Sequence, residues 1–400
     1  PKKKFNNKLK NKFIILFGFL IYSSSLFFLG GGKNKIINYA KNIPKSTKVK
    51  IRNSLPYQLY QSKFKANVPK NIIMGLTQKA DPIYLDIKQK NINKLELKRK
   101  NALSKGILIT SNEDFVKAVI SNKELSLDAK IRLKGDWTDH LASKMPSYRV
   151  KIEGDKTFLG MNRFSLQMPV TRNYIWEWVY HKFLKEEGLP SLRYNFLPLV
   201  VNGVHKGIYA IEEHFDKILI ESNKFKEGPI VKLSEDRLWL QRLDDMPEKD
   251  EYFKTFSTGF RVNKINRNKI LKENFNVANQ LLNGFHEGKL NTSDVFDIES
   301  LAKFFAISDL LGASHALIWH NMRFYYDPIK SRLIPIGFDG NTNFSGFAID
   351  KLSVEAPSKW LVSFFNDLEF SREYFKSLKK VSQREYVDKF FESNQKEFNE

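Results

Sequence analysis

Alternating apolar and polar positions predict several strands in the part of the chain that follows residue 80. The stretch IYLDI (83–87) alternates, the runs ILIT, FVKAVI and AKIRL are short and β-rich, and SYRVKIEG (147–154) alternates again. In this last stretch Tyr148, Val150 and Ile152 share one face of a strand, while Arg149 and Lys151 share the other. The pattern predicts a small, sheet-rich lobe.

Helical periodicity takes over further along the chain. Residues 91–106 place Leu side chains along one helical face and end at Gly106, residues 172–187 form an amphipathic helix, and residues 299–319 form a largely apolar one. Between the last two, residues 194–213 predict a hairpin that turns at Asn202-Gly203. Strands, one helix, a hairpin and then mostly helices indicate an α+β fold, with a more helical lobe second.

A late hairpin carries the most suggestive chemistry. Asn321 precedes a strand, Asp339 follows another, and a turn at Asp327-Pro328 would bring both polar groups to one end of the hairpin. An amide oxygen and a carboxylate suit Mg²⁺, which uses few protein ligands. The same two residues would equally serve as hydrogen-bonding caps on hairpin ends.

Charge is distributed very unevenly. Of the net charge of +22, residues 1–50 carry +12 and residues 51–105 carry +9, whereas the remaining 295 residues carry only +1. The basicity therefore belongs to an amino-terminal arm. A folded domain without massed basic residues argues against nucleic-acid binding, so we expect no nucleic-acid partner.

An apolar run accounts for part of this arm. Residues 13–29 are uncharged and follow six Lys; as a helix they would span roughly 26 Å, marginally enough for a bilayer. A cleaved signal peptide has the same basic start. We interpret the run as an uncleaved single-pass transmembrane helix, with the bulk of the chain extracytoplasmic because basic flanks stay in the cytoplasm.

Other candidate residues have plain structural alternatives. Lys151 on its strand, and Glu212 or Glu213 at the end of residues 207–213, could form the Lys–Glu pair that orients phosphates, or could be solvated strand faces. His315 and His320 lie five residues apart, which does not place them on one helical face, so a zinc site is not expected. The absence of cysteine excludes thiolate chemistry.

Four segments, in this order, resemble the spore coat protein H (CotH) kinase-like family. They are PSYRVKIEGDKTFLGMNRF, the helix end KEEGLP, the hairpin LVVNGVHKGIYAIEEHFD and HNMRFYYDPIKSRLIPIGFDG, and the resemblance spans roughly residues 80–345. It implies an atypical protein-kinase-like, two-lobed fold that uses ATP and Mg²⁺ to phosphorylate Ser in secreted or surface proteins.

The resemblance also assigns roles to individual residues. It implies nucleotide binding by Arg149, Lys151 and Glu213, and metal binding by Asn321 and Asp339.

Two positions depart from the family pattern. The catalytic Asp expected five residues before Asn321 is Ala316, and the first Asp of an Asp-x-Asp metal motif is Gly337. His315 could replace the missing base after a shift of one residue, and Asp136 or Asp139 could reach the site from the other lobe.

We therefore predict four segments: a cytoplasmic tip and anchor (1–30), a basic stalk (31–79), a CotH-like domain (80–346) and a helical carboxyl-terminal extension (347–400) that continues past residue 400. The predicted function is Mg²⁺-dependent nucleotide binding at a membrane-anchored, extracytoplasmic protein, with possible phosphorylation of envelope proteins or surface polymers. The alternative is a pseudokinase or scaffold of the cell envelope without phosphotransfer.

Overall fold

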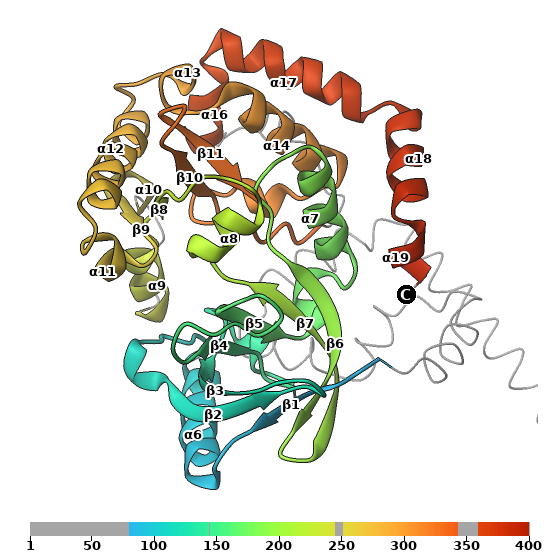
Figure 1. Cartoon of the computed structure of the whole chain (residues 1–400). Coiled ribbons are helices and arrows are strands. Elements are labelled where there is room, and N and C mark those ends of the chain that lie inside the picture. Colours follow the sequence, from blue (N-terminus) through green and yellow to red (C-terminus); the bar gives the residue numbers. More distant parts are fainter. Residues whose placement is uncertain (1–79, 144, 245–250, 343–358, 400) are drawn as a thin grey trace, which may run out of the picture. The chain divides into compact units, whose positions relative to one another are not determined.

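The computed structural model describes residues 80–143, 145–244, 251–342 and 359–399 (Figure 1). All of them belong to one unit of the chain, Ile73–Glu400. The expected anchor at residues 13–29 and the stalk at 31–79 lie outside the described residues. None of the described helices is long and apolar enough to cross a membrane.

Seven strands close into a barrel in the order β1-β2-β3-β4-β5-β7-β6. Every neighbouring pair is antiparallel except β1 and β6, whose parallel pairing completes the ring. The strands are β1 Ile83–Asp86, β2 Val116–Ser121, β3 Ser126–Leu133, β4 Tyr148–Ile152, β5 Arg163–Gln167, β6 Tyr194–Val201 and β7 Val204–Glu213.

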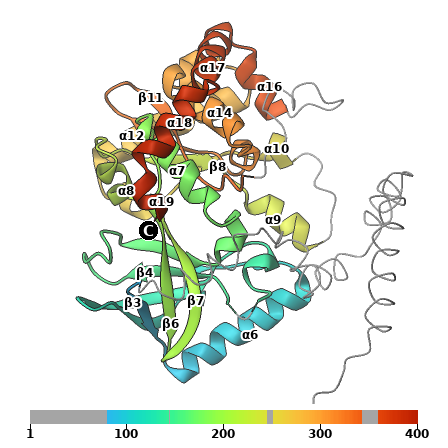
Figure 2. The same cartoon turned by 90° about the vertical axis from the view of Figure 1, so that its right-hand side faces the viewer.

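Alternation fills the barrel interior with apolar side chains. In β3 the residues Leu127, Ala129, Ile131 and Leu133 are buried, while the residues between them are exposed or half-buried. They join one apolar core with inward residues of the other strands. Helix α6 (Gln89–Lys105) lies against the barrel on the side away from the helical part of the chain, and it ends at Gly106 (φ 79°) (Figures 1 and 2).

The hairpin of β6 and β7 turns where the sequence predicts. Asn202 (φ 47°) and Gly203 (φ 76°) both adopt left-handed backbone, the conformation that a two-residue type I′ turn requires. The Asn202 side chain also accepts a hydrogen bond from Ile87 N at 2.7 Å and donates one to Ile87 O at 2.8 Å. The turn is thereby tied to the chain just after β1.

The rest of the chain is helical around a four-stranded sheet of order β11-β10-β8-β9. Helix α14 (Ile298–Leu310) is buried on most of its surface and lies beside α17 (Leu368–Val381) (Figure 2). Phe305 makes edge-to-face contacts with Phe364 of α16 (Lys359–Phe365) and with Phe370 of α17. The strands are β8 Ile230–Leu233, β9 Ser257–Gly259, β10 Arg323–Asp327 and β11 Arg332–Ile336. The helices are α7 Trp176–Glu186, α8 Lys217–Ser222, α9 Asp236–Leu243, α10 Glu251–Lys254, α11 Val262–Ile265, α12 Lys269–His286, α13 Thr292–Val295, α14 Ile298–Leu310, α16 Lys359–Phe365, α17 Leu368–Val381, α18 Arg384–Ser393 and α19 Gln395–Asn399.

A mixed α+β architecture is thus confirmed, with three local differences from the sequence-based elements. The run ILIT is not a strand; only Ile107 forms an isolated bridge, to Trp137. Helix α7 begins at Trp176 because Asn173 and Tyr174 have positive φ. Helix α14 stops at Leu310, after which Gly312 turns the chain (φ 60°) into a short 3-10 segment, Ser314–Leu317.

Candidate active site

Cationic side chains cover the outer face of three barrel strands. Strand pairing sets Arg149 opposite Arg132, and Lys151 opposite both Lys130 and Arg163, while the residues between them point into the barrel core. Like charges directly opposite one another on a sheet are unfavourable. Such a face is therefore better explained by a role in binding than by stability.

A buried ion pair lies at one end of this face. Lys134 follows β3, and its Nζ donates to Glu212 Oε2 of β7 at 2.6 Å and also to Gln167 Oε1. Gln167 Nε2 and the Ser165 hydroxyl donate to the same carboxylate, at 3.2 and 3.3 Å. Desolvation opposes ionisation of Glu212, but Lys134 and nearby arginines lower its pKa to about 2. Desolvation lowers the pKa of Lys134 to about 8, so both groups are charged at neutral pH.

A second group of paired charges joins Asp339, which follows β11, to Arg172, which precedes α7. Arg172 Nε lies 2.9 Å from Asp339 Oδ1, and both side chains are 9% exposed. The two atoms are close enough for an ion pair but not aligned as a hydrogen bond. Burial alone would raise the pKa of Asp339, but the Arg172 and His315 charges hold it well below its ordinary range.

His315 connects this carboxylate to the amide of Asn321. Its Nδ1 lies 3.2 Å from Asp339 Oδ1 and 3.1 Å from Asn321 Nδ2, and Asn321 Nδ2 also donates to His315 O at 3.0 Å. Desolvation acts to lower the pKa of His315, but the charge of Asp339 and the hydrogen bond to it raise the pKa above its usual value. With a proton on Nδ1, the N–H is directed at the backbone oxygen of Asp339 at 3.2 Å, and Asn321 Nδ2 donates to His315 O alone. Asp339 Oδ1 is equally close but is not aligned as a hydrogen bond among the described residues. Nε2 then remains available, and the ring is 38% exposed.

Glu177 of α7 holds the loop that carries Asp339 through hydrogen bonds. This fully buried carboxylate accepts hydrogen bonds from Gly340 N at 3.1 Å and Asn341 N at 3.0 Å. Asp339 itself has a left-handed backbone (φ 54°), which a non-glycine residue adopts only where its surroundings impose it. The position of the carboxylate is therefore set by α7 as well as by Arg172.

The two departures from the family pattern have structural explanations. A side chain at Gly337 would begin 2.1 Å from Leu184 Cδ1 of α7, so an Asp cannot replace it unless the buried Leu184 side chain moves. Ala316 is 1% exposed and belongs to the main apolar core of the helical part. An Asp at position 316 would therefore be buried among apolar side chains.

Asn321, Asp339 and His315 are thus brought together, whereas the predicted Lys151 and Glu213 are not. Glu213 forms an ion pair with Arg193, and Lys151 lies further along β4. Arg149 shares the cationic face, and its buried Nε has no hydrogen-bond partner among the described residues. The nucleotide- and metal-binding roles of these residues stay predictions.

Sequence reasoning missed two residues, Lys134 and Arg172. Lys134 continues the alternation of Lys130 and Arg132 on β3, so the sequence did carry a signal for it. Nothing in the sequence signals Arg172, because its partner lies 167 residues away. Of the acidic residues expected to reach in from the other lobe, Asp136 is exposed and Asp139 accepts from His140 N at 3.0 Å.

Comparison with known families identifies the family to which the chain belongs. A family model described as CotH kinase protein matches residues 131–394, from within β3 to the end of α18. The chain belongs to the CotH kinase family. A search of curated proteins found no match. The CotH match includes every charged residue of the site described above except Lys130, which lies one position before it, and the match runs past residue 346, the predicted end of the domain.

Proposed function

We propose that this CotH-family protein has an atypical kinase-like fold, with the barrel and the helical part as two lobes, and that it transfers a phosphoryl group from ATP to a hydroxyl acceptor. The supporting observation is the Arg172–Asp339–His315 chain. A histidine whose Nδ1 faces the backbone oxygen and the buried carboxylate of Asp339, with its ring partly open to solvent, is arranged as a general base.

In this proposal some residues of the chain bind the phosphates and others take part in proton transfer. Lys134 and Arg149 supply positive charge for the phosphates, and Glu212 holds Lys134 in place. His315 Nε2 accepts the proton of the acceptor hydroxyl as its oxygen bonds to the γ-phosphorus and the bond to the bridging oxygen breaks. Asp339 stabilises the imidazolium that forms.

Magnesium fits this site only together with phosphate groups. Among the described residues no three His, Cys, Asp or Glu side chains converge on one point. Asp339 already has Oδ1 occupied by Arg172 and His315, which leaves Oδ2 and the amide oxygen of Asn321 as ligands. A Mg²⁺ ion that arrives with a nucleotide needs no more, and it would neutralise charge on the transferring phosphate.

A pseudokinase is the second candidate, and two observations favour it. The carboxylate that should hold the metal is paired with Arg172, and Ala316 occupies the position of the usual base. Such a protein would bind a nucleotide or a partner without chemistry. The two candidates differ in the transfer step.

Titration calorimetry with Mg²⁺–ATP, combined with a phosphate-transfer assay on hydroxyl-bearing acceptors, tests both candidates. His315→Gln should leave nucleotide binding near wild type and lower transfer by about 10²-fold or more. Lys134→Met should weaken binding itself. Binding without transfer in the wild-type protein would leave the pseudokinase. No binding at millimolar ATP would refute the kinase and every nucleotide-binding form of the pseudokinase, and would leave only a scaffold that binds a partner.

We further propose that residues 13–29 anchor the protein in a membrane with its CotH domain outside and with envelope proteins or surface polymers as acceptors. The supporting observation is the uncharged apolar run behind six Lys. Protease added to intact cells should digest the domain. A domain that is protected until the cells are lysed would contradict this topology.

A further inference from the structure

A cavity lies on the same cationic face of the barrel, and neither Asp339 nor His315 lines it. Its volume is about 600 Å³, and it is formed by β3, β4 and β5 on one side and by the segment of α11 on the other. Of the described residues that line it, none is an acid and six are cations: Lys130, Lys151, Arg163, Arg261, Lys264 and Arg267.

These charges are poorly compensated by the protein. Within the described residues only Lys130 has an ion-pair partner, Glu153 at 3.0 Å, which lies outside the lining. Arg163 Nε and Arg261 Nη1 are buried and have no hydrogen-bond partner in the part of the chain that the structure describes. Desolvation and the neighbouring Arg261 lower the pKa of Arg163 to about 10. Buried donors without acceptors destabilise a fold unless a ligand supplies the acceptors.

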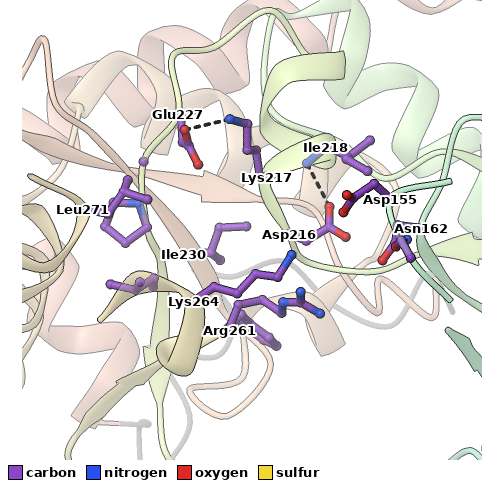
Figure 3. Close-up of a pocket in the computed structure, with 15 residues that line it drawn as sticks. Asp155, Asn162, Asp216, Lys217, Ile218, Glu227, Ile230, Arg261, Lys264 and Leu271 are labelled. Atoms are coloured by element: carbon purple, nitrogen blue, oxygen red, sulfur yellow. Dashed lines mark hydrogen bonds and ion pairs between the residues drawn. The ribbon is translucent and has the colours of Figure 1, made fainter. Parts of the chain in front are cut away.

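A smaller cavity adjoins this one, and both acidic and basic side chains line it. It has a volume of about 200 Å³ and shares Arg261 and Lys264 with the larger cavity, and Asp155 and Asp216 lie on its other side (Figure 3). The Asp216 carboxylate is occupied by Ile218 N and Leu219 N, at 2.9 and 3.3 Å. The smaller cavity therefore has mixed charge, whereas the larger one is purely cationic.

We infer that the larger cavity binds a compact ligand that carries several closely spaced phosphate groups. A phosphate monoester carries roughly −1.5 to −2 charges, so three or four such groups balance six cations. Tetrahedral phosphates can also accept hydrogen bonds from guanidinium groups on both walls. This inference concerns binding alone and does not depend on phosphotransfer at His315.

Two other ligands match the cavity less well. A nucleobase prefers apolar or aromatic walls, and Phe115 and Val262 are the only large apolar side chains in this lining. An acidic peptide carries one charge per residue, so it would need about twice as many carboxylates as phosphates to balance the same cations. A ligand of high charge density is therefore favoured.

Tripolyphosphate is the probe, and the full chain is the protein to use. Calorimetry at physiological salt should show that Arg163→Gln and Arg267→Gln each weaken tripolyphosphate binding by about tenfold, because each removes a charged hydrogen-bond donor. Both variants should keep wild-type affinity for Mg²⁺–ATP. Arg149→Gln should do the reverse, since Arg149 does not line this cavity.

The matched control is Arg384→Gln, which removes the same charge from a side chain that is 89% exposed and pairs only within its own helix. It should leave tripolyphosphate binding unchanged. The arm at residues 1–105 contributes the same background to every variant. If Arg384→Gln weakened binding as much as Arg163→Gln, the binding would be non-specific and the inference would be overturned.

Amine acylation followed by mass spectrometry locates the ligand independently of any variant. Tripolyphosphate should protect Lys151 and Lys264 at concentrations that leave Lys389 on α18 reactive. Equal protection of all three would overturn the inference. So would tighter binding of polyglutamate or of a thymidine oligonucleotide at this cavity, or a loss of ATP binding in Arg163→Gln equal to its loss of tripolyphosphate binding.

Discussion

The ion pair between Arg172 and Asp339 makes a quantitative prediction about stability. Each residue is less than 10% exposed, so removing one partner leaves the other charge buried. We expect Arg172→Met and Asp339→Asn each to lower the free energy of unfolding by about 3 kcal/mol, in the range known for broken buried pairs. Met retains the apolar stem of Arg172, and Asn retains the shape of Asp339.

The double variant separates the pair interaction from other effects. Once both charges are gone, no uncompensated charge remains, so the double variant should be more stable than the sum of the two single losses predicts, by about 2 kcal/mol. Without Arg172, His315 still lies beside Asp339 and partly compensates its charge. The coupling energy between Arg172 and Asp339 should therefore be smaller than the loss of stability caused by one single substitution. Urea denaturation followed by circular dichroism measures all four proteins, and an unchanged m value shows that the folded states are comparable.

A surface pair in the same chain provides the control. Arg384 and Asp388 are 3.3 Å apart with side chains 89% and 56% exposed, so their coupling should be about 0.3–0.5 kcal/mol. If the Arg172–Asp339 coupling is no larger than that of the control pair, the argument that Asp339 depends on Arg172 is refuted.

Acid titration checks the same pair in another way. Because the pKa of Asp339 is lowered in the folded state, the unfolded chain binds the proton first, and stability falls as the pH drops below about 4. Arg172→Met should flatten that decline. An acid limb identical to that of the wild type would contradict the assignment.

Three further predictions follow from buried positions. Desolvation lowers the pKa of His320 to about 4, so the unfolded state binds the proton first. The urea midpoint should therefore fall as the pH drops from 6.5 to 4, and it should fall less steeply in His320→Gln. Identical slopes for the two proteins would contradict this. Ala316→Asp should destabilise the protein by several kcal/mol and should not raise phosphotransfer, and a wild-type urea midpoint would disprove its core placement. Gly337→Ala should cost about 1–3 kcal/mol and be partly rescued by Leu184→Ala, and a failed rescue would mean that the two do not collide.

Local pattern predicts this fold better than it predicts the site. Alternation at Tyr148–Ile152 and the Asn-Gly turn at Asn202-Gly203 are local signals, and the structure has both elements. The convergence of Asn321 and Asp339 also follows from one hairpin, since both lie within 3.2 Å of the same His315 nitrogen.

The Lys–Glu pair depends on long-range pairing instead. Lys151 and Glu213 stand at the positions that the family pattern assigns to nucleotide binding. The register of β4, β5 and β7, however, places Lys151 opposite Arg163 and Glu213 opposite Phe164. A shift of one residue along β7 exchanges Glu213 for Glu212, which faces Lys134. No local pattern fixes that register, so sequence reasoning could not choose between the two glutamates.

The parallel pairing of β1 with β6 limits how this protein can be shortened. The CotH match begins at residue 131, within β3, so a fragment cut at that boundary would lack β1 and β2. The ring would then open and leave β3 and β6 as unpaired strand edges, which are sites of edge-to-edge aggregation. Expression trials on this chain should therefore start before Ile83, because the boundary of the homologous region is not the boundary of the folding unit.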